Sequence, residues 1–208
     1  MKNFFKLLYV SFLCSLFVLS FSVIGKASEN TLIIENMKTD NLLEPLGIDS
    51  EYPVFSWNLS DPETRGQKQT SYRIMLALSE DDLTNGIYVW DSGVIRSAET
   101  ANITYSGDTL EASTRYFWQL EIGDKDGNKV SSEISWFETG LMDSGWSNAK
   151  WIAKTDLDST ESVTDSSPMF RKEFSTASGK TVANARLYFT SAGIYRAFIN
   201  GEKVTDSY

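Results

Sequence analysis

The sequence contains no histidine, one cysteine and four prolines among 208 residues. Without histidine, neither a Ser-His-Asp triad nor a Cys-His pair can form within the chain, and metal sites built on histidine are excluded. The one cysteine, Cys14, lies in the amino-terminal apolar stretch, so the remainder of the chain carries no disulfide. An exported protein without disulfides suits a bacterial periplasm or cell surface.

Long apolar runs are also scarce, with one exception at the amino terminus. There, Lys2 and Lys6 precede an apolar run from Leu7 to Ile24, and the small residues Gly25 and Ala27 follow it. A basic start, an apolar stretch and small residues before a cut are typical of a secretory signal peptide. We predict a signal peptide over residues 1–27, with cleavage near Ala27 and no membrane contact afterwards. The alternative is an uncleaved transmembrane anchor, because the run is nearly long enough to span a bilayer.

Positive charge is in short supply. The net charge is −9, and it becomes −12 when the three lysines of residues 1–27 are removed. An acidic surface repels nucleic acid and anionic membranes, so the sequence predicts neither as a partner. Nothing in the sequence indicates the oligomeric state.

Short runs of alternating apolar and polar residues recur between residues 31 and 141, each bounded by turn residues. Such runs are typical of β-strands that bury one face. Seven strands in about a hundred residues predict an all-β domain over 28–142, an immunoglobulin-like or fibronectin type III-like sandwich. The predicted strands are 31–35, 54–59, 71–79, 87–94, 102–107, 115–123 and 134–140.

Two local patterns support this sandwich. Leu110, Thr114 and Tyr116 have the spacing of a tyrosine corner, in which the tyrosine hydroxyl bonds back to the backbone. Trp57 lies in an early strand, where such modules bury a core tryptophan. All four residues are therefore interpreted as structural. The alternative for Trp57 is stacking against a sugar, but aromatic side chains at strand spacing mostly belong to the core.

A second unit follows a linker at 143–149. Residues 150–208 predict an incomplete, jelly-roll-like β-sandwich with strands at 169–175, 185–190, 193–199 and 202–207. Asn200-Gly201 predicts a tight hairpin turn, because both residues tolerate positive φ. No long helix is expected after residue 27. Open sheet edges should leave this unit less stable than the first.

The carboxylates do not indicate an active site. Asp81 and Asp82 are expected in a solvated loop, and Glu133 and Glu138 are too far apart to act as a reliable pair. The segment Asp124–Asn128 has some features of a calcium loop, but its glycine comes too early and a hairpin turn is the better interpretation. We therefore predict no catalytic residue, no metal and no cofactor within the chain.

A family resemblance supplies what these patterns do not. The segments that carry it run in order through almost all of the chain after residue 27, and WDSG, FETGL and GIYRAFINGEKV are the most specific. They are EPLGID (44–49), FSW (55–57), RGQKQTSYRI (65–74), VWDSG (89–93), YFWQLEIGDKDGN (116–128), WFETGL (136–141), KWIA (150–153), PMFRKEF (168–174) and ARLYFTSAGIYRAFINGEKV (185–204). Together they resemble the amino-terminal region of bacterial alpha-L-rhamnosidases of glycoside hydrolase family 78.

This resemblance implies a fibronectin-like sandwich, then a β-sandwich of the rhamnosidase amino-terminal type, and then a helical-barrel catalytic domain. Members of the family are inverting hydrolases of terminal rhamnose, and their catalytic carboxylates lie in the barrel. The sequence ends before a barrel, so no catalytic residue is carried over. The expectation is a non-catalytic accessory region of a secreted rhamnosidase, truncated and inactive alone. The alternative is a stand-alone secreted carbohydrate-binding or adhesive sandwich protein.

The resemblance also raises sugar contact by the second sandwich, with rhamnose-containing carbohydrate as the partner. The candidate residues are Tyr195 and Asn200, an aromatic ring and an amide near one turn. The alternative interpretation is structural: Tyr195 packs against the neighbouring strand while Asn200 makes the turn. We favour the structural interpretation.

Overall fold

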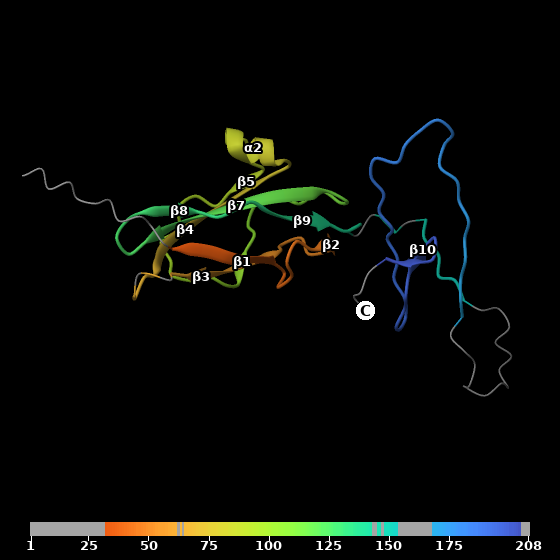
Figure 1. Cartoon of the computed structure of the whole chain (residues 1–208), viewed down its shortest axis with the longest axis horizontal. Helices are drawn as coiled ribbons and strands as arrows, with labels where there is room; N and C mark the ends of the chain where they lie inside the picture. The colour runs from red at the N-terminus through yellow and green to blue at the C-terminus, as the bar shows by residue number, and fades with distance from the viewer. Residues whose placement is uncertain are drawn as a thin grey trace, which may run out of the picture. The chain divides into compact units, whose positions relative to one another are not determined.

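Two β-sheets face each other over the first part of the chain (Figure 1). The computed structural model describes residues 32–204 except 62, 64, 143–144, 147 and 154–167. The smaller sheet has the order β1-β3-β6, with β1 at Ile33–Thr39, β3 at Val54–Ser60 and β6 at Ile103–Thr104. The larger sheet has the order β2-β9-β7-β4-β5, and β8 pairs with β7. Its strands are β2 (Leu46–Ile48), β4 (Gln69–Ala77), β5 (Trp90–Asp91), β7 (Arg115–Asp124), β8 (Lys129–Ser131) and β9 (Ser135–Thr139).

An aromatic core joins the two sheets. Phe55 in β3 is fully buried, and its ring centroid lies 4.7 Å from that of Trp118 in β7. In β7, every second residue faces this core, as the alternation predicts. Tyr116, Trp118, Leu120 and Ile122 are all buried. The predicted all-β sandwich is confirmed.

The outer face of the larger sheet carries a short helix that the sequence analysis did not predict. Asp81 and Asp82, expected in a loop, lie in the first turn of α2 (Glu80–Asn85). Ser79 caps this helix by accepting a hydrogen bond from the backbone N–H of Asp82 at 3.1 Å. Gly86 ends it in the left-handed conformation, with φ of 74°. Leu83 packs from α2 onto Met75 and Ala77 of β4, so β4 is buried on both faces.

The carboxyl-terminal segment contains less sheet than predicted. Residues 169–175 and 185–190 are not strands, and the predicted strand at 193–199 is reduced to β10 (Phe198–Ile199). Of the strand predicted at 202–207, the described part contains β11 (Glu202–Lys203), and residues 205–207 lie outside the described residues. Phe174 is 79% exposed and Leu187 is 56% exposed, so these apolar side chains find no facing layer among the described residues. Alternating patterns form strands only where a partner strand and a buried face exist. The hairpin at Asn200-Gly201 is confirmed.

The predicted signal peptide at 1–27 lies outside the described residues. Among the described residues, no helix has the length and apolar character needed to cross a membrane.

Candidate functional site

The candidate site centres on Glu138, near the end of β9. This residue is 6% exposed, although it is a carboxylate. Its strand lies between β7 and the short parallel strand β2, and its backbone N–H donates to the carbonyl oxygen of Pro45 at 2.9 Å. A carboxylate this buried is stable only with charged partners and hydrogen bonds. The structure supplies two arginines.

Arg115 is the partner from within the sandwich. It begins β7 and lies directly opposite Glu138 in the antiparallel register. Its Nε and Nη2 both donate to Oε2 of Glu138, each at 3.2 Å. The guanidinium also lies over the ring of Trp136, 3.9 Å from the ring centroid, which is a cation–π geometry. Two neighbours therefore fix the side chain of Arg115.

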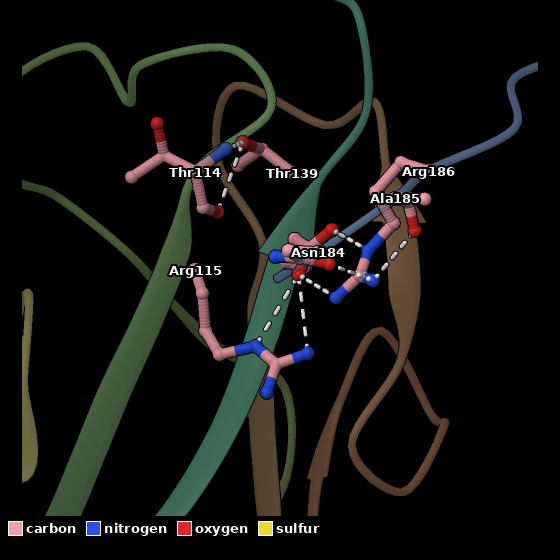
Figure 2. Close-up of polar contacts among 7 residues, drawn as sticks. Thr114, Arg115, Thr139, Asn184, Ala185 and Arg186 are labelled. Carbon is pink, nitrogen blue, oxygen red and sulfur yellow. Dashed lines mark hydrogen bonds and ion pairs between the residues drawn. The ribbon is translucent and has the colours of Figure 1, made fainter. Parts of the chain in front are cut away.

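Arg186 is the partner from the carboxyl-terminal segment, 48 residues along the chain. Its Nε donates to Oε1 of Glu138, and its Nη2 donates to Oε2 at 2.7 Å. Its Nη1 donates to Oδ1 of Asn184 at 2.8 Å and to the carbonyl oxygen of Ala185 at 3.1 Å. Figure 2 shows the two guanidinium groups converging on one carboxylate. We call Arg115, Glu138 and Arg186 the ionic triad.

The ionic triad lies in an open pocket of about 540 Å³. The pocket is lined by Ser113, Arg115, Glu138, Asn184, Arg186 and Tyr188. Two cations and one anion give this lining a net positive charge at neutral pH. Because both arginines bind the one carboxylate, the pocket lacks the free acid–base pair that hydrolysis requires.

The arginines keep Glu138 ionised. The hydrogen bond from Arg186 lowers the pKa of the Glu138 carboxyl below its ordinary value of about 4.5; burial opposes this effect, and Arg115 adds to it. A carboxyl group with a lowered pKa holds no proton to donate near neutral pH. Glu138 is therefore an anchoring anion and not a general acid.

We predict that the pKa of Glu138 rises toward its ordinary value in the Arg186→Gln chain. Removing Arg186 takes away the strongest hydrogen bond to the carboxylate, while burial still disfavours the charged form. A ¹³C NMR titration of the glutamate side-chain carboxyl groups measures this directly. The exposed Arg171–Glu173 pair provides the control, since Arg171→Gln should leave the Glu138 titration unchanged. A Glu138 pKa that is identical in both variants would contradict the role given to Arg186.

The predicted tyrosine corner lies next to the ionic triad. The hydroxyl of Tyr116 accepts a hydrogen bond from the backbone N–H of Glu111 at 2.8 Å, five residues upstream. Thr139, which follows Glu138, accepts from the N–H of Thr114 at 2.9 Å and donates to the carbonyl oxygen of Glu111 at 2.6 Å. Leu110 is buried in the core below. These bonds fix the start of β7 and hence the backbone that carries Arg115.

Tyr116→Phe should lower the free energy of unfolding by about 1 kcal/mol, because the backbone N–H of Glu111 loses its part-buried hydrogen bond while the ring packing is retained. Urea unfolding followed by tryptophan fluorescence measures the change. Tyr52→Phe is the matched control, since Tyr52 is 57% exposed and should tolerate the loss of its hydroxyl. An equal effect in the two variants would show that the corner hydrogen bond does not stabilise the fold.

Of the remaining residues singled out in the sequence, Trp57 is packed in the core, Tyr195 is partly exposed and Asn200 lies in a turn. Trp57 is 2% exposed, and its Nε1–H donates to Oε1 of Gln69 at 3.0 Å, so its ring presents no face to a sugar. Tyr195 contacts the ring of Phe189 edge-on, with centroids 4.4 Å apart. Asn200 has φ of 51° in the hairpin turn. The ionic triad includes neither Tyr195 nor Asn200.

The segment Asp124–Asn128 is a turn. The Asp124 carboxylate accepts from the backbone N–H groups of Asp126 and Asn128, each at 2.8 Å, and from the side-chain amides of Asn128 and Gln67. Its oxygens are thus occupied by local donors, as in other Asx turns. Within the part of the chain that the structure describes, no group of three or more cysteine, aspartate and glutamate side chains could hold a metal ion.

Two family profiles match the chain in succession. Residues 34–143 match the Rha78A-like, N-terminal immunoglobulin domain, and residues 180–208 match the alpha-L-rhamnosidase N-terminal domain. An alpha-L-rhamnosidase of Formosa agariphila is 34% identical over 182 residues, which are 78% of this chain and 19% of that protein. The chain spans about a fifth of the length of the curated relatives that cover most of it.

Solved structures of alpha-L-rhamnosidases also match the part of the chain that contains the sandwich. The alpha-L-rhamnosidase of Streptomyces avermitilis, solved in complex with L-rhamnose, matches 56% of this chain and 11% of its own with 36% identity and a TM-score of 0.53. The enzyme of Dictyoglumus thermophilum matches 60% of this chain and 14% of its own, with 35% identity and a TM-score of 0.55. With more than half of its length matched, the chain belongs to the family of Rha78A-like N-terminal immunoglobulin domains.

Proposed function

We propose that this chain serves as the non-catalytic accessory region of a secreted alpha-L-rhamnosidase, whose catalytic part removes terminal alpha-L-rhamnose from glycans or glycosides with inversion. The observation that carries the proposal is the order of the two family matches, an immunoglobulin domain followed by a rhamnosidase N-terminal domain. The relatives that share this region are rhamnosidases. The accessory role is structural: the sandwich provides a rigid body beside the segment that follows it.

The chemistry of the ionic triad supports a non-catalytic role. An inverting glycosidase needs a general acid and a general base about 6.5–9.5 Å apart across the scissile bond. The pocket is lined by one carboxylate, that of Glu138, and two arginines hold it in the ionised form. The ionised carboxylate cannot act as the acid, both of its oxygens are occupied by arginine donors, and the pocket lining contains no second carboxylate.

An activity assay tests this proposal. We expect the chain to release no p-nitrophenol from p-nitrophenyl alpha-L-rhamnopyranoside above the rate in buffer. The control is the same assay with a catalytically complete alpha-L-rhamnosidase. Saturable turnover that persists through purification and is lost in the Glu138→Gln variant would overturn the non-catalytic assignment.

Secretion is part of the proposal, and its support is the amino-terminal sequence pattern. Expression of the full chain in a bacterial host should release a product that begins at Ser28. Amino-terminal sequencing of the periplasmic or extracellular fraction gives the start directly. A product that retains residues 1–27 in the membrane fraction would favour the anchor instead.

Binding of a rhamnose-containing carbohydrate is the alternative function, and the partly exposed ring of Tyr195 is the observation that favours it. Its test is retardation of the chain on an affinity gel that contains a rhamnose-bearing polysaccharide. Retardation that disappears in Tyr195→Ala would support the alternative. Migration equal to that on a gel without polysaccharide would remove it.

A further inference from the structure

The Glu138 carboxylate is only half satisfied by the sandwich itself. Both hydrogen bonds from Arg115 go to Oε2. Among the described residues, the donor to Oε1 is Nε of Arg186. With Arg186 in place the Glu138 side chain is buried, and a buried carboxylate oxygen without a donor is costly, so Glu138 needs a second partner besides Arg115.

The sandwich also fixes the geometry of this anion before any partner arrives. Glu138 is held between two neighbouring strands, and its N–H is bonded to Pro45. Arg115 is held by the cross-strand register and by the ring of Trp136. Preorganised groups lose little conformational entropy when a ligand binds.

The geometry of the remaining contacts selects a guanidinium over an ammonium. Arg186 places Nε on one carboxylate oxygen and Nη2 on the other, which is a two-pronged pairing. Its third nitrogen, Nη1, is bonded to Asn184 and to the carbonyl of Ala185. A lysine ammonium is a point charge on a flexible stem and cannot reproduce this planar pairing.

We propose that Glu138, Arg115 and Trp136 form a guanidinium-binding socket on the immunoglobulin-like sandwich, and that Arg186 is its ligand. The socket fixes the segment around residues 184–188 at the carboxyl end of β9. It is an interaction surface for an arginine side chain, and it holds whether or not the chain serves a rhamnosidase.

The test uses the full chain with Arg186→Ala, which empties the socket without touching the sandwich core. Methylguanidinium is titrated into it while the NMR signals of the Trp136 indole N–H and the Arg115 Nε–H are followed. We expect saturable shifts, with methylguanidinium binding about tenfold or more tightly than methylammonium. The wild-type chain should give no saturable shift, because Arg186 already occupies the socket.

Three results would overturn the socket. The first is the absence of saturable shifts in a folded Arg186→Ala chain. The second is equal binding of the two cations, and the third is binding that survives an added Glu138→Gln substitution. Arg186→Lys provides a second variant with the charge retained, and methylguanidinium should displace its ammonium group and shift the same two signals.

A distance measurement follows the docked segment itself. In the Cys14→Ser chain, spin labels at Ser131 of β8 and at the exposed Ser178 report the separation of the sandwich and the segment. We expect Arg186→Gln to broaden the distance distribution and Arg171→Gln, which breaks the exposed Arg171–Glu173 pair, to leave it unchanged. Equal broadening in both, or none in Arg186→Gln, would contradict docking through the socket.

Discussion

Phe55→Ala should lower the free energy of unfolding of the sandwich by about 3–5 kcal/mol, the range measured for aromatic-to-alanine changes in packed cores. Phe55 is fully buried and lies among three aromatic rings of the opposite sheet. Its centroid distances are 4.7 Å to Trp118, 6.2 Å to Trp90 and 6.2 Å to Phe137. Truncation would leave a cavity that none of these rigid rings can fill, because each is fixed by its own strand.

Urea unfolding followed by tryptophan fluorescence measures this loss, and Phe55→Leu separates the cavity from the loss of the ring. The leucine variant should recover at least half of the difference, since it restores most of the apolar volume. Tyr52→Ala serves as the control, because Tyr52 is 57% exposed and its truncation should cost within about 0.5 kcal/mol. A cost below about 1 kcal/mol for Phe55→Ala would mean that the two sheets do not depend on this aromatic contact.

The fold of the sandwich follows from alternation in its long strands. In β7, the apolar residues at every second position allow one orientation of the strand, because a shift by one residue would bury Arg115 and Gln119 instead. The tyrosine corner was also predictable, because the Tyr116 hydroxyl and the backbone N–H of Glu111 that it binds are only five residues apart in the sequence. Both depend on residues close together in sequence, which a pattern can represent.

Short elements are not predictable in this way. The three residues of β2 are too few to show alternation, and the strand exists because β9 offers it an edge. The helix α2 has a signal that could have been used: Ser79 stands three residues before Asp82, and Gly86 follows the last turn. The predictions of strands at 169–175 and 185–190 were wrong although the alternating pattern is present, because these segments have no facing layer among the described residues.

The ionic triad was beyond the sequence because it depends on register and on a distant segment. Arg115 and Glu138 are 23 residues apart and meet only because β7 and β9 pair at those positions. Arg186 follows Glu138 by 48 residues, and no periodicity relates them. A usable signal was the charged residue in β9 itself, where Glu138 follows Trp136 and Phe137 in a strand with little exposure. A charge inside an otherwise buried strand indicates a partner from another element.

Glu138→Gln should cost about 2–3 kcal/mol of unfolding free energy, somewhat below the usual range for a broken buried pair because both arginines remain partly exposed. The amide is nearly isosteric but neutral, so Arg115 and Arg186 would face each other without the anion that separates their charges. Arg186→Gln should cost less than Glu138→Gln, since Glu138 keeps the two hydrogen bonds from Arg115. The Glu138 carboxylate therefore contributes more to stability than either arginine alone.

Because stability depends on the Glu138 carboxylate, it also depends on whether that group is ionised, and hence on pH. The folded-state pKa of Glu138 is lowered, so its stabilising contribution is present above the ordinary value of about 4.5 and is lost as the pH falls through the folded-state pKa. Urea midpoints measured from neutral pH to strongly acidic pH should therefore decline less steeply for Glu138→Gln than for the wild-type chain.

The double variant Glu138→Gln/Arg186→Gln should be no less stable than Glu138→Gln alone, because Arg186 has no anion left to bind and its removal relieves repulsion. Additive losses in the double variant, or parallel acid profiles for the wild type and Glu138→Gln, would show that the carboxylate does not couple the sandwich to Arg186.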